Sequence, residues 1–325
     1  MNNQENLPKL DAKDREILRE LDDNFRQSFS KIGKKVNLSK NSVALRYEKL
    51  KQYSLHNMVG INYELLNLTT VKVYYSFDYY SEELEESIIN EVKKYPNVQW
   101  VSRYFGGYDI ILCFLVSNLD DLSSQINKFD ERFANKINRK EIQILFKQHF
   151  FRYNFLHDKP LSWVSKLEKS KTKQKLSNID KNIIRDMLYV PRENVVDIAR
   201  RLKISPKTVS NRVKFLEEAG IIMGYFMTID SRKFNHDTFK LFVQLQNLKK
   251  GKEFEDSLSS LKNIKFFGKL LGMWDYEVDL ICLNNLELQK QIESIKEKFP
   301  GLIKKVEVIS FGRRLFTNKS GSFIQ

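Results

Sequence analysis

Two stretches of the chain combine basic side chains with amides and hydroxyls at helical spacing. The first stretch follows Ser39 and contains Lys40, Asn41, Arg46 and Lys49. The second follows Ser205 and contains Lys207, Thr208, Asn211, Arg212 and Lys214. Lys and Arg neutralise phosphates, and Asn and Arg can make paired hydrogen bonds to purine edges in the major groove. These residue types favour contact with double-stranded DNA.

We predict DNA contacts from both stretches and from the helix that precedes each. The predicted residues are Lys34, Lys35, Ser39, Lys40, Asn41, Ser42, Leu45, Arg46 and Lys49, and in the second stretch Arg200, Arg201, Lys203, Lys207, Thr208, Asn211, Arg212 and Lys214. The alternative is a basic helical face that is merely solvated. For Arg46 and Arg212 a further alternative is an ion pair within the same domain, with Asp14 or Asp180.

Three short helices are needed to position each stretch. In the first set, Asp11 is a suitable N-cap, and Ser39 caps a helix whose apolar residues Val43, Tyr47 and Leu50 share one face. In the second set, Ser205 is the cap, Pro206 occupies the first helical position, and the apolar residues are Val209, Val213 and Leu216. A short helix, a tight turn and a capped helix predict a helix-turn-helix.

The composition agrees with an anionic partner. The 325 residues include 55 Lys and Arg against 41 Asp and Glu, giving a net charge of +14, and Lys31–Lys51, Arg200–Lys214 and the segment 158–175 together exceed that total. A hydrophobic fraction of 42% excludes global disorder, and two Cys exclude a disulfide scaffold. Without a signal segment, a membrane-length apolar run or a catalytic motif, we expect a cytoplasmic protein that is no enzyme, with no catalytic residue, cofactor or metal.

The two basic stretches belong to a tandem duplication. A shift of 166 residues superimposes Asp14 on Asp180, Arg26 on Arg192, Ser39 on Ser205, Gly106 on Gly272 and Asp109 on Asp275. One fixed offset over so long a span indicates that one unit was copied. After its helices, each unit alternates strands and helices in the order βαββαβ, with capping residues such as Ser81 and Asn118. This order predicts a ferredoxin-like layer of helices on an antiparallel sheet.

The expected fold class is α+β, with two winged helix-turn-helix domains alternating with two ferredoxin-like βαββαβ domains. We place the first helix-turn-helix at 1–62 and the first βαββαβ domain at 63–156. A basic linker follows at 157–175. The second helix-turn-helix spans 176–230 and the second βαββαβ domain spans 231–318.

The motifs resemble those of the leucine-responsive/asparagine-regulator (Lrp/AsnC) family of transcription regulators, with an archaeal character. The matching segments are LDAKDREIL at 10–18, VNLSKNSVALRYEKL at 36–50, GGYD at 106–109, ISPKTVSNRVKFLEEAGIIMGY at 204–225 and GMWD at 272–275. The resemblance implies a sequence-specific DNA-binding regulator. It implies that the βαββαβ (RAM-type) domains oligomerise and bind a small effector such as an amino acid.

By this resemblance the candidate effector residues are Gly106, Tyr108, Asp109, Gly272, Trp274 and Asp275. The alternative for both aspartates is a turn carboxylate that accepts backbone N–H bonds. We also expect the halves to pair within the chain as a pseudo-dimer, with higher homo-oligomers open, that presents two reading heads to half-sites about 34–36 Å apart.

Two further expectations concern asymmetry and rival functions. Gly220 ends the second recognition helix where the first unit has Ser54, so we expect the two heads to read different half-sites. Siroheme decarboxylases resemble the same architecture, but that enzyme needs His and Arg in its pocket, with a His-containing stretch near the third strand. The third strands here, DIILCFLV and DYEVDLIC, contain no His. A ligand sensor or scaffold that does not bind DNA is the other alternative.

Overall fold

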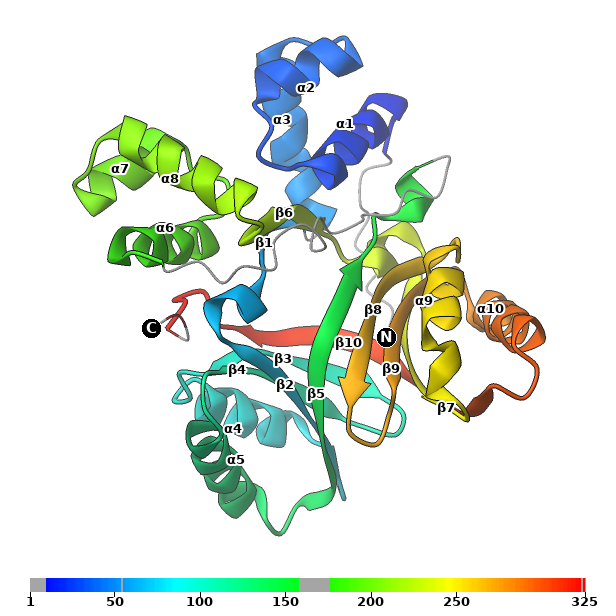
Figure 1. Cartoon of the computed structure of the whole chain (residues 1–325). Helices are drawn as coiled ribbons and strands as arrows, with labels where there is room; N and C mark the ends of the chain where they lie inside the picture. Colours follow the sequence, from blue (N-terminus) through cyan, green and yellow to red (C-terminus); the bar gives the residue numbers. More distant parts are fainter. Residues whose placement is uncertain (1–9, 54, 158–175, 323, 325) are drawn as a thin grey trace. The chain divides into compact units, whose positions relative to one another are not determined.

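The chain folds as two units, each of which contains segments from both halves of the sequence. The computed structural model describes residues 10–53, 55–157, 176–322 and 324, so Ser54 and the segment 158–175 lie outside the described residues. Residues 10–62, 151–157 and 177–236 form a helix-turn-helix unit, and residues 63–150 and 237–322 form a sheet unit (Figure 1).

The first head is built from α1 (Ala12–Asp23), α2 (Phe29–Val36) and α3 (Lys40–Leu50), followed by a 3-10 turn at Lys51–Tyr53. Asp11 and Asp14 form a capping box at the start of α1, which satisfies backbone N–H groups that a helix start leaves unpaired. Val43, Tyr47 and Leu50 are buried, as their spacing predicts. They pack among buried residues of α1 and α2 that include Ile17, Leu21 and Ile32.

The second head repeats this arrangement with α6 (Asn178–Tyr189), α7 (Val195–Leu202) and α8 (Pro206–Glu218). Val209, Val213 and Leu216 are buried, and Pro206 starts α8 as expected. Gly220 has a φ of 73°, the left-handed conformation that favours glycine after a helix. The predicted helix end at this residue is therefore confirmed.

One strand from each head joins the two heads. Strand β1 (His56–Ile61) pairs antiparallel with β6 (Ile222–Thr228), and Gly60 lies opposite Gly224. A Cβ on Gly60 would lie 1.9 Å from the ring of Phe226, so any larger residue at this crossing would require that ring to move. The strand that follows each recognition helix thus pairs with its counterpart in the other head.

The sheet unit contains the two predicted βαββαβ domains. The first runs through a 3-10 turn at Tyr63–Leu66, β2 (Thr69–Phe77), α4 (Glu82–Val92), β3 (Val98–Phe105), β4 (Ile110–Val116), α5 (Leu119–Phe133) and β5 (Ile137–Phe150). The second runs through β7 (Asp237–Leu245), a 3-10 turn at Leu248–Lys250, α9 (Gly251–Ser259), β8 (Ile264–Leu271), β9 (Tyr276–Cys282), α10 (Asn285–Lys298) and β10 (Ile303–Thr317).

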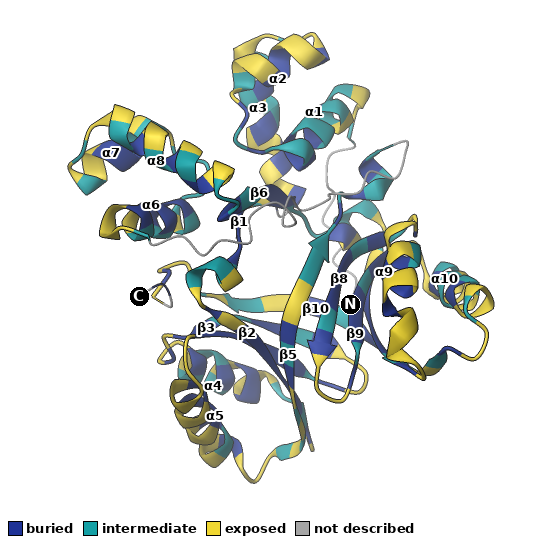
Figure 2. Cartoon of the chain, viewed as in Figure 1, coloured by how far each residue is buried: buried dark blue, intermediate teal, exposed yellow. Residues whose placement is uncertain are grey.

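The strands of both domains form one closed barrel in the order β10-β3-β4-β2-β5-β8-β9-β7. The seams between the halves are β5 with β8 and β10 with β3. Alternate residues face outward and inward: Val71, Val73 and Tyr75 pack under α4 and α5, whereas Tyr74 faces the barrel core. Figure 2 shows that β2 and β4 are mostly buried, whereas α5 has an exposed face. The expected pairing of the halves is therefore present in the strand register.

The structure departs from the sequence expectations in two respects. The backbone N–H of Asp109 donates to the carbonyl oxygen of Tyr75, and the N–H of Asp275 donates to that of Val243. Equivalent residues of β2 and β7 are therefore 168 positions apart in the sequence, not the expected 166. Residues 151–156 and 231–236, which the sequence placed in the βαββαβ domains, belong to the helix-turn-helix unit. Asp22 accepts the backbone N–H of Tyr153 in the first segment, and Phe234 of the second segment packs against Tyr53.

Short 3-10 turns at Asn154–Leu156 and Ser231–Phe234 complete these two segments. Among the helices that the structure describes, none has the length and apolarity that a bilayer crossing requires.

Candidate nucleic-acid interface

Each recognition helix is held at its start by a serine and a left-handed turn. The Ser39 hydroxyl accepts the N–H of Ser42 at 3.1 Å, and the Ser205 hydroxyl accepts the N–H of Thr208 at 3.0 Å. The preceding helices end at Asn37 and Lys203, whose φ values are 55° and 56°. The two heads therefore present their third helices through the same local geometry, although asparagine adopts this conformation more readily than lysine.

Most of the predicted DNA-contact residues lie on the surface of the heads. The exposed ones are Lys34, Lys35, Ser39, Lys40, Asn41, Leu45 and Lys49 in the first head, and Arg200, Arg201, Lys203, Lys207, Asn211 and Lys214 in the second. The half-buried ones are Ser42, Arg46, Thr208 and Arg212. Leu45 is 62% exposed, which leaves an apolar group on the outer face of α3.

Arg46 and Arg212 form the ion pairs that were the alternative to DNA contact. The Nη1 atom of Arg46 lies 2.6 Å from Asp11 Oδ2 and 2.7 Å from Asp14 Oδ1. Arg212 bonds both oxygens of Asp180, through Nε at 2.6 Å and Nη2 at 2.7 Å. In both heads the arginine of the recognition helix is thus tied to the start of the first helix, and DNA contact by these two side chains stays a prediction.

These pairs shift the ionisation of their members. Burial raises the pKa of Asp180, but hydrogen bonds from Arg212 and Ser177 outweigh it, so the pKa lies below its ordinary value. The hydrogen bonds to Asp11 and Asp14 raise the pKa of Arg46. The guanidinium groups therefore stay charged and paired at neutral pH.

Several other cations of the predicted set also have acidic partners. Arg201 bonds Asp186 and Glu193, Lys35 bonds Glu20, and Arg200 lies 2.8 Å from Asp197. Within the described part of the chain, no ion pair engages the lysines Lys34, Lys40, Lys49, Lys203 and Lys207. These five exposed lysines are the strongest candidates for phosphate contact.

A reciprocal pair of arginines connects the two heads. Arg26 donates to the carbonyl oxygens of Pro191 at 2.9 Å and Glu193 at 3.1 Å, and Arg192 donates to that of Gln27 at 3.0 Å. Arg192 also lies over the rings of Phe29 and Tyr47. The repeat pairs Arg26 with Arg192 in the sequence, but only the structure reveals that each reaches the other head.

The Gly-x-x-Asp turns are held by the fold in both domains. Gly106 and Gly272 have φ values of 123° and 155°, which favour glycine. Asp109 Oδ2 accepts the N–H of Phe77 at 2.8 Å, and Asp275 Oδ2 accepts that of Leu245 at 2.7 Å. Both aspartates therefore act as turn carboxylates, as the alternative proposed.

The aromatic residues of these turns are also committed to the fold. Tyr108 and Trp274 are buried in the barrel core, where they pack around Phe242. Effector binding by Tyr108 and Trp274 stays a prediction, and it would require access to two buried side chains. Effector binding at Gly106, Gly272 or the two aspartates stays a prediction.

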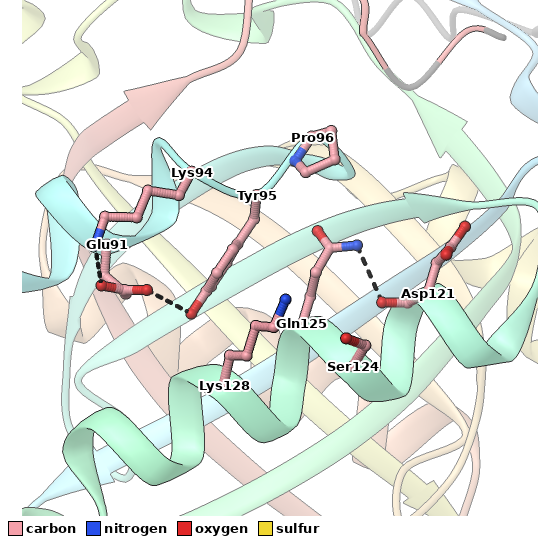
Figure 3. Close-up of a pocket in the computed structure, with 8 residues that line it drawn as sticks. All are labelled: Glu91, Lys94, Tyr95, Pro96, Asp121, Ser124, Gln125 and Lys128. Carbon is pink, nitrogen blue, oxygen red and sulfur yellow. Dashed lines mark hydrogen bonds and ion pairs between the residues drawn. The ribbon is translucent and has the colours of Figure 1, made fainter.

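A surface pocket of about 350 Å³ lies between α4 and α5, away from both turns (Figure 3). Its lining residues are Glu91, Lys94, Tyr95, Pro96, Asp121, Ser124, Gln125 and Lys128. Glu91 already bonds Lys94 and Tyr95, and Gln125 bonds the Asp121 carbonyl oxygen. The sequence did not indicate this pocket, and no part of the predicted interface lines it.

Comparison with known families matches the two heads separately. Residues 10–51 match the AsnC-type helix-turn-helix domain, and residues 176–223 match a winged helix-turn-helix DNA-binding domain. The transcriptional regulator Ptr1 of Methanocaldococcus jannaschii is 33% identical over 120 residues, which cover 37% of this chain and 76% of Ptr1. LrpC of Bacillus subtilis is 27% identical over 124 residues, 38% of this chain and 83% of LrpC.

The fold of the whole chain is also found in a solved structure. The siroheme decarboxylase NirDL aligns with a TM-score of 0.61 over 96% of this chain and 97% of its own. The two sequences are 12% identical over that alignment. The likeness therefore shows the fold alone.

Proposed function

This chain belongs to the Lrp/AsnC family of transcription regulators, and we propose that it binds double-stranded DNA with two unlike reading heads in one polypeptide. The observation that carries the proposal is the duplicated recognition helix. Helices α3 and α8 have the same serine cap, the same Arg–Asp anchor to the first helix, and an outer face of lysines and asparagines. We place its action in the cytoplasm.

The five exposed lysines that form no ion pair with any described residue support the phosphate part of the proposal. Lys34 and Lys203 are exposed near the ends of the second helices, and Lys40 and Lys207 are exposed at the starts of the recognition helices. Positions flanking a helix-turn-helix are suited to the two backbones of the major groove. We assign Asn41 and Asn211 to base edges, because an asparagine amide can bond adenine bidentately.

Arg46 and Arg212 have a different role in this proposal. Each anchors its recognition helix to the first helix of the same head, so it positions the DNA-contacting residues. Substitution of these arginines would then weaken DNA binding through the fold of the head, which makes them poor reporters of direct contact.

The test is DNA binding by the full chain as a function of salt. We expect Lys34→Gln with Lys203→Gln to reduce the slope of log K against log salt by about two, one for each lost phosphate contact. The matched control, Lys128→Gln with Lys290→Gln, removes two exposed lysines from α5 and α10 of the sheet unit. Equal slopes for wild type and both variants would contradict the proposal.

Control by a small molecule such as an amino acid is a second part of the proposal. Titration calorimetry of the full chain with the free amino acids tests it. Saturable binding of an amino acid that changes the affinity for DNA would support control by an effector. The absence of binding heat with every amino acid would contradict an amino-acid effector.

The likeness to NirDL makes an enzyme the second candidate, and it concerns the fold alone. Strands β4 and β9 are the third strands of their domains and contain no His. Absorbance titration with an iron tetrapyrrole separates the two functions. A bound spectrum together with salt-independent, weak DNA binding would favour the enzyme over the regulator.

A further inference from the structure

The barrel core contains three buried charged groups, Lys72, Lys240 and Glu277, which together with the half-buried Asp279 form what we call the buried charge cluster. Lys72 bonds Glu277 across the two halves. Lys240 lies 3.2 Å from Glu277 and 2.5 Å from Asp279. Lys72, Lys240 and Glu277 are 4%, 2% and 0% exposed. The Tyr74 hydroxyl also donates to Glu277 at 3.2 Å.

The cluster breaks the symmetry of the repeat. Because β2 and β7 are offset by 168 residues, Lys72 and Lys240 occupy equivalent positions. Strands β4 and β9 keep the 166-residue offset, so the positions of Glu277 and Asp279 are occupied in the first half by Ile111 and Cys113. Each half therefore supplies one lysine, whereas the second half supplies both acids.

This distribution makes the charge of the core depend on which halves pair. A first half with a second half gives two lysines and two acids, which is neutral. Two first halves from two chains would bury two lysines with no acid. Two second halves would place two lysines against four acids. An unpaired buried charge is far more costly than a paired one.

From this charge balance we infer that the buried charge cluster selects the partner of each half, so that a first half pairs with a second half and not with another first half. Arg314 of the second half lies beside the cluster over Trp100, and desolvation lowers its pKa. Its charge is present only in pairings that contain a second half, so two first halves would still bury two lysines with no acid. Replacing buried ion pairs by apolar residues often leaves stability unchanged or raised, so selection of a partner is a role that such a cluster can have.

The structure provides a reporter for the correct pairing. Lys147 on β5 and Lys269 on β8 lie opposite each other across a seam between the halves. Directly opposite strand residues are close enough for a disulfide. With cysteines at both positions, pairing of a first half with a second half gives the disulfide. Two first halves would instead place position 147 opposite Arg103, the equivalent of Lys269, and no disulfide forms.

The test compares three full chains that carry Lys147→Cys and Lys269→Cys, refolded at low and high protein concentration. They have the natural cluster, the double substitution Lys72→Met with Glu277→Met, or the control Lys128→Met. The double substitution leaves every pairing neutral, so it folds without selecting a partner. At high concentration we expect the double variant to have about tenfold more chains without the intrachain disulfide than the chain with the natural cluster. We also expect it to form multimers on size-exclusion chromatography.

The natural chain and the control should keep the intrachain disulfide at both concentrations. Equal disulfide yields for all three chains would overturn the inference. If the double variant fails to fold, the charge exchange Lys72→Glu with Glu277→Lys decides. In this variant the cluster is still neutral when a first half pairs with a second half, and it is still charged when two first halves pair. The variant should therefore retain the intrachain disulfide. Loss of the disulfide in a folded charge-exchange variant would also overturn the inference.

Discussion

At the residue scale, each head uses an arginine–aspartate pair to orient its third helix. The Arg–Asp pair connects α3 to α1 and α8 to α6, and in the second head it is bidentate on an aspartate with no exposed surface. An arginine fork that engages a carboxylate in two bonds fixes orientation as well as distance. The pair therefore sets the angle of the recognition helix within each head.

The second head should lose stability in acid. The pKa of Asp180 is lowered in the fold, so its contribution is complete above the ordinary aspartate pKa near 4 and declines as the pH falls through the lower folded value. Hydrogen exchange of the α8 amides, corrected for intrinsic rates, should therefore accelerate below pH 4.

Asp180→Asn is the matched variant for this measurement. At neutral pH it should cost about 1–3 kcal/mol of local stability, because the bidentate pair with Arg212 is lost. It should also remove the acid-dependent part of the exchange. Identical pH profiles for the variant and the wild type would contradict a role for this ionisation.

The asparagines should govern sequence preference and the lysines salt dependence. Asn41→Ala should relax discrimination at one position of one half-site by about 1–3 kcal/mol, and Asn211→Ala should do so in the other half-site. Binding to a library of single-base variants of the selected site measures this. Asn127→Ala, on the exposed face of α5, is the control.

At the scale of elements, the β1–β6 ladder and the two arginines join the heads into one body. The ladder orients the strands that leave the recognition helices. Arg26 and Arg192 connect the loops between the first and second helices of opposite heads. Charge-assisted bonds to carbonyl oxygens are among the stronger hydrogen bonds in proteins.

Removal of both arginines should loosen the spacing between the half-sites. For the wild type, inserting about five base pairs between half-sites puts them on opposite faces of the duplex and should lower affinity more than tenfold. Arg26→Ala with Arg192→Ala should show a smaller loss. Binding to a series of spacings measures it, and Arg15→Ala, exposed on α1, is the control. The same dependence of affinity on spacing in the wild type, the double variant and the control would contradict a role for Arg26 and Arg192 in fixing the two heads relative to each other.

At the scale of the whole molecule, duplication allowed the two halves to diverge where a homodimer must stay symmetric. The outer faces of α3 and α8 differ, with Leu45 in the first occupying the position of Asn211 in the second. The buried charge cluster differs between halves in the same way. One polypeptide can therefore contain two unlike heads and one barrel.

This divergence predicts an asymmetric binding site. Selection from random DNA should return two different half-sites. Replacing the outer residues of α3 by those of α8 should move the selected site toward a palindrome. A palindrome selected by the natural chain would contradict the prediction.

The sequence by itself determined the duplicated unit, the helix caps, the buried faces of the recognition helices and the βαββαβ order. These features depend on local spacing and on the fixed offset between the halves. It also gave both alternatives for Arg46 and for Asp109, because each residue type suits a ligand and a structural bond equally well.

Only the tertiary structure decided between those alternatives, because the partners lie far along the chain. Asp14 approaches Arg46 through helix packing, and Arg26 reaches Glu193 only when the heads pair. Which residues of β2 and β7 are equivalent likewise depends on how each strand pairs with its own neighbour. Lys72 lies opposite Cys113 and Lys240 opposite Asp279, which makes the two lysines equivalent. Long-range pairing, which leaves no local pattern, converts a duplicated sequence into one asymmetric molecule.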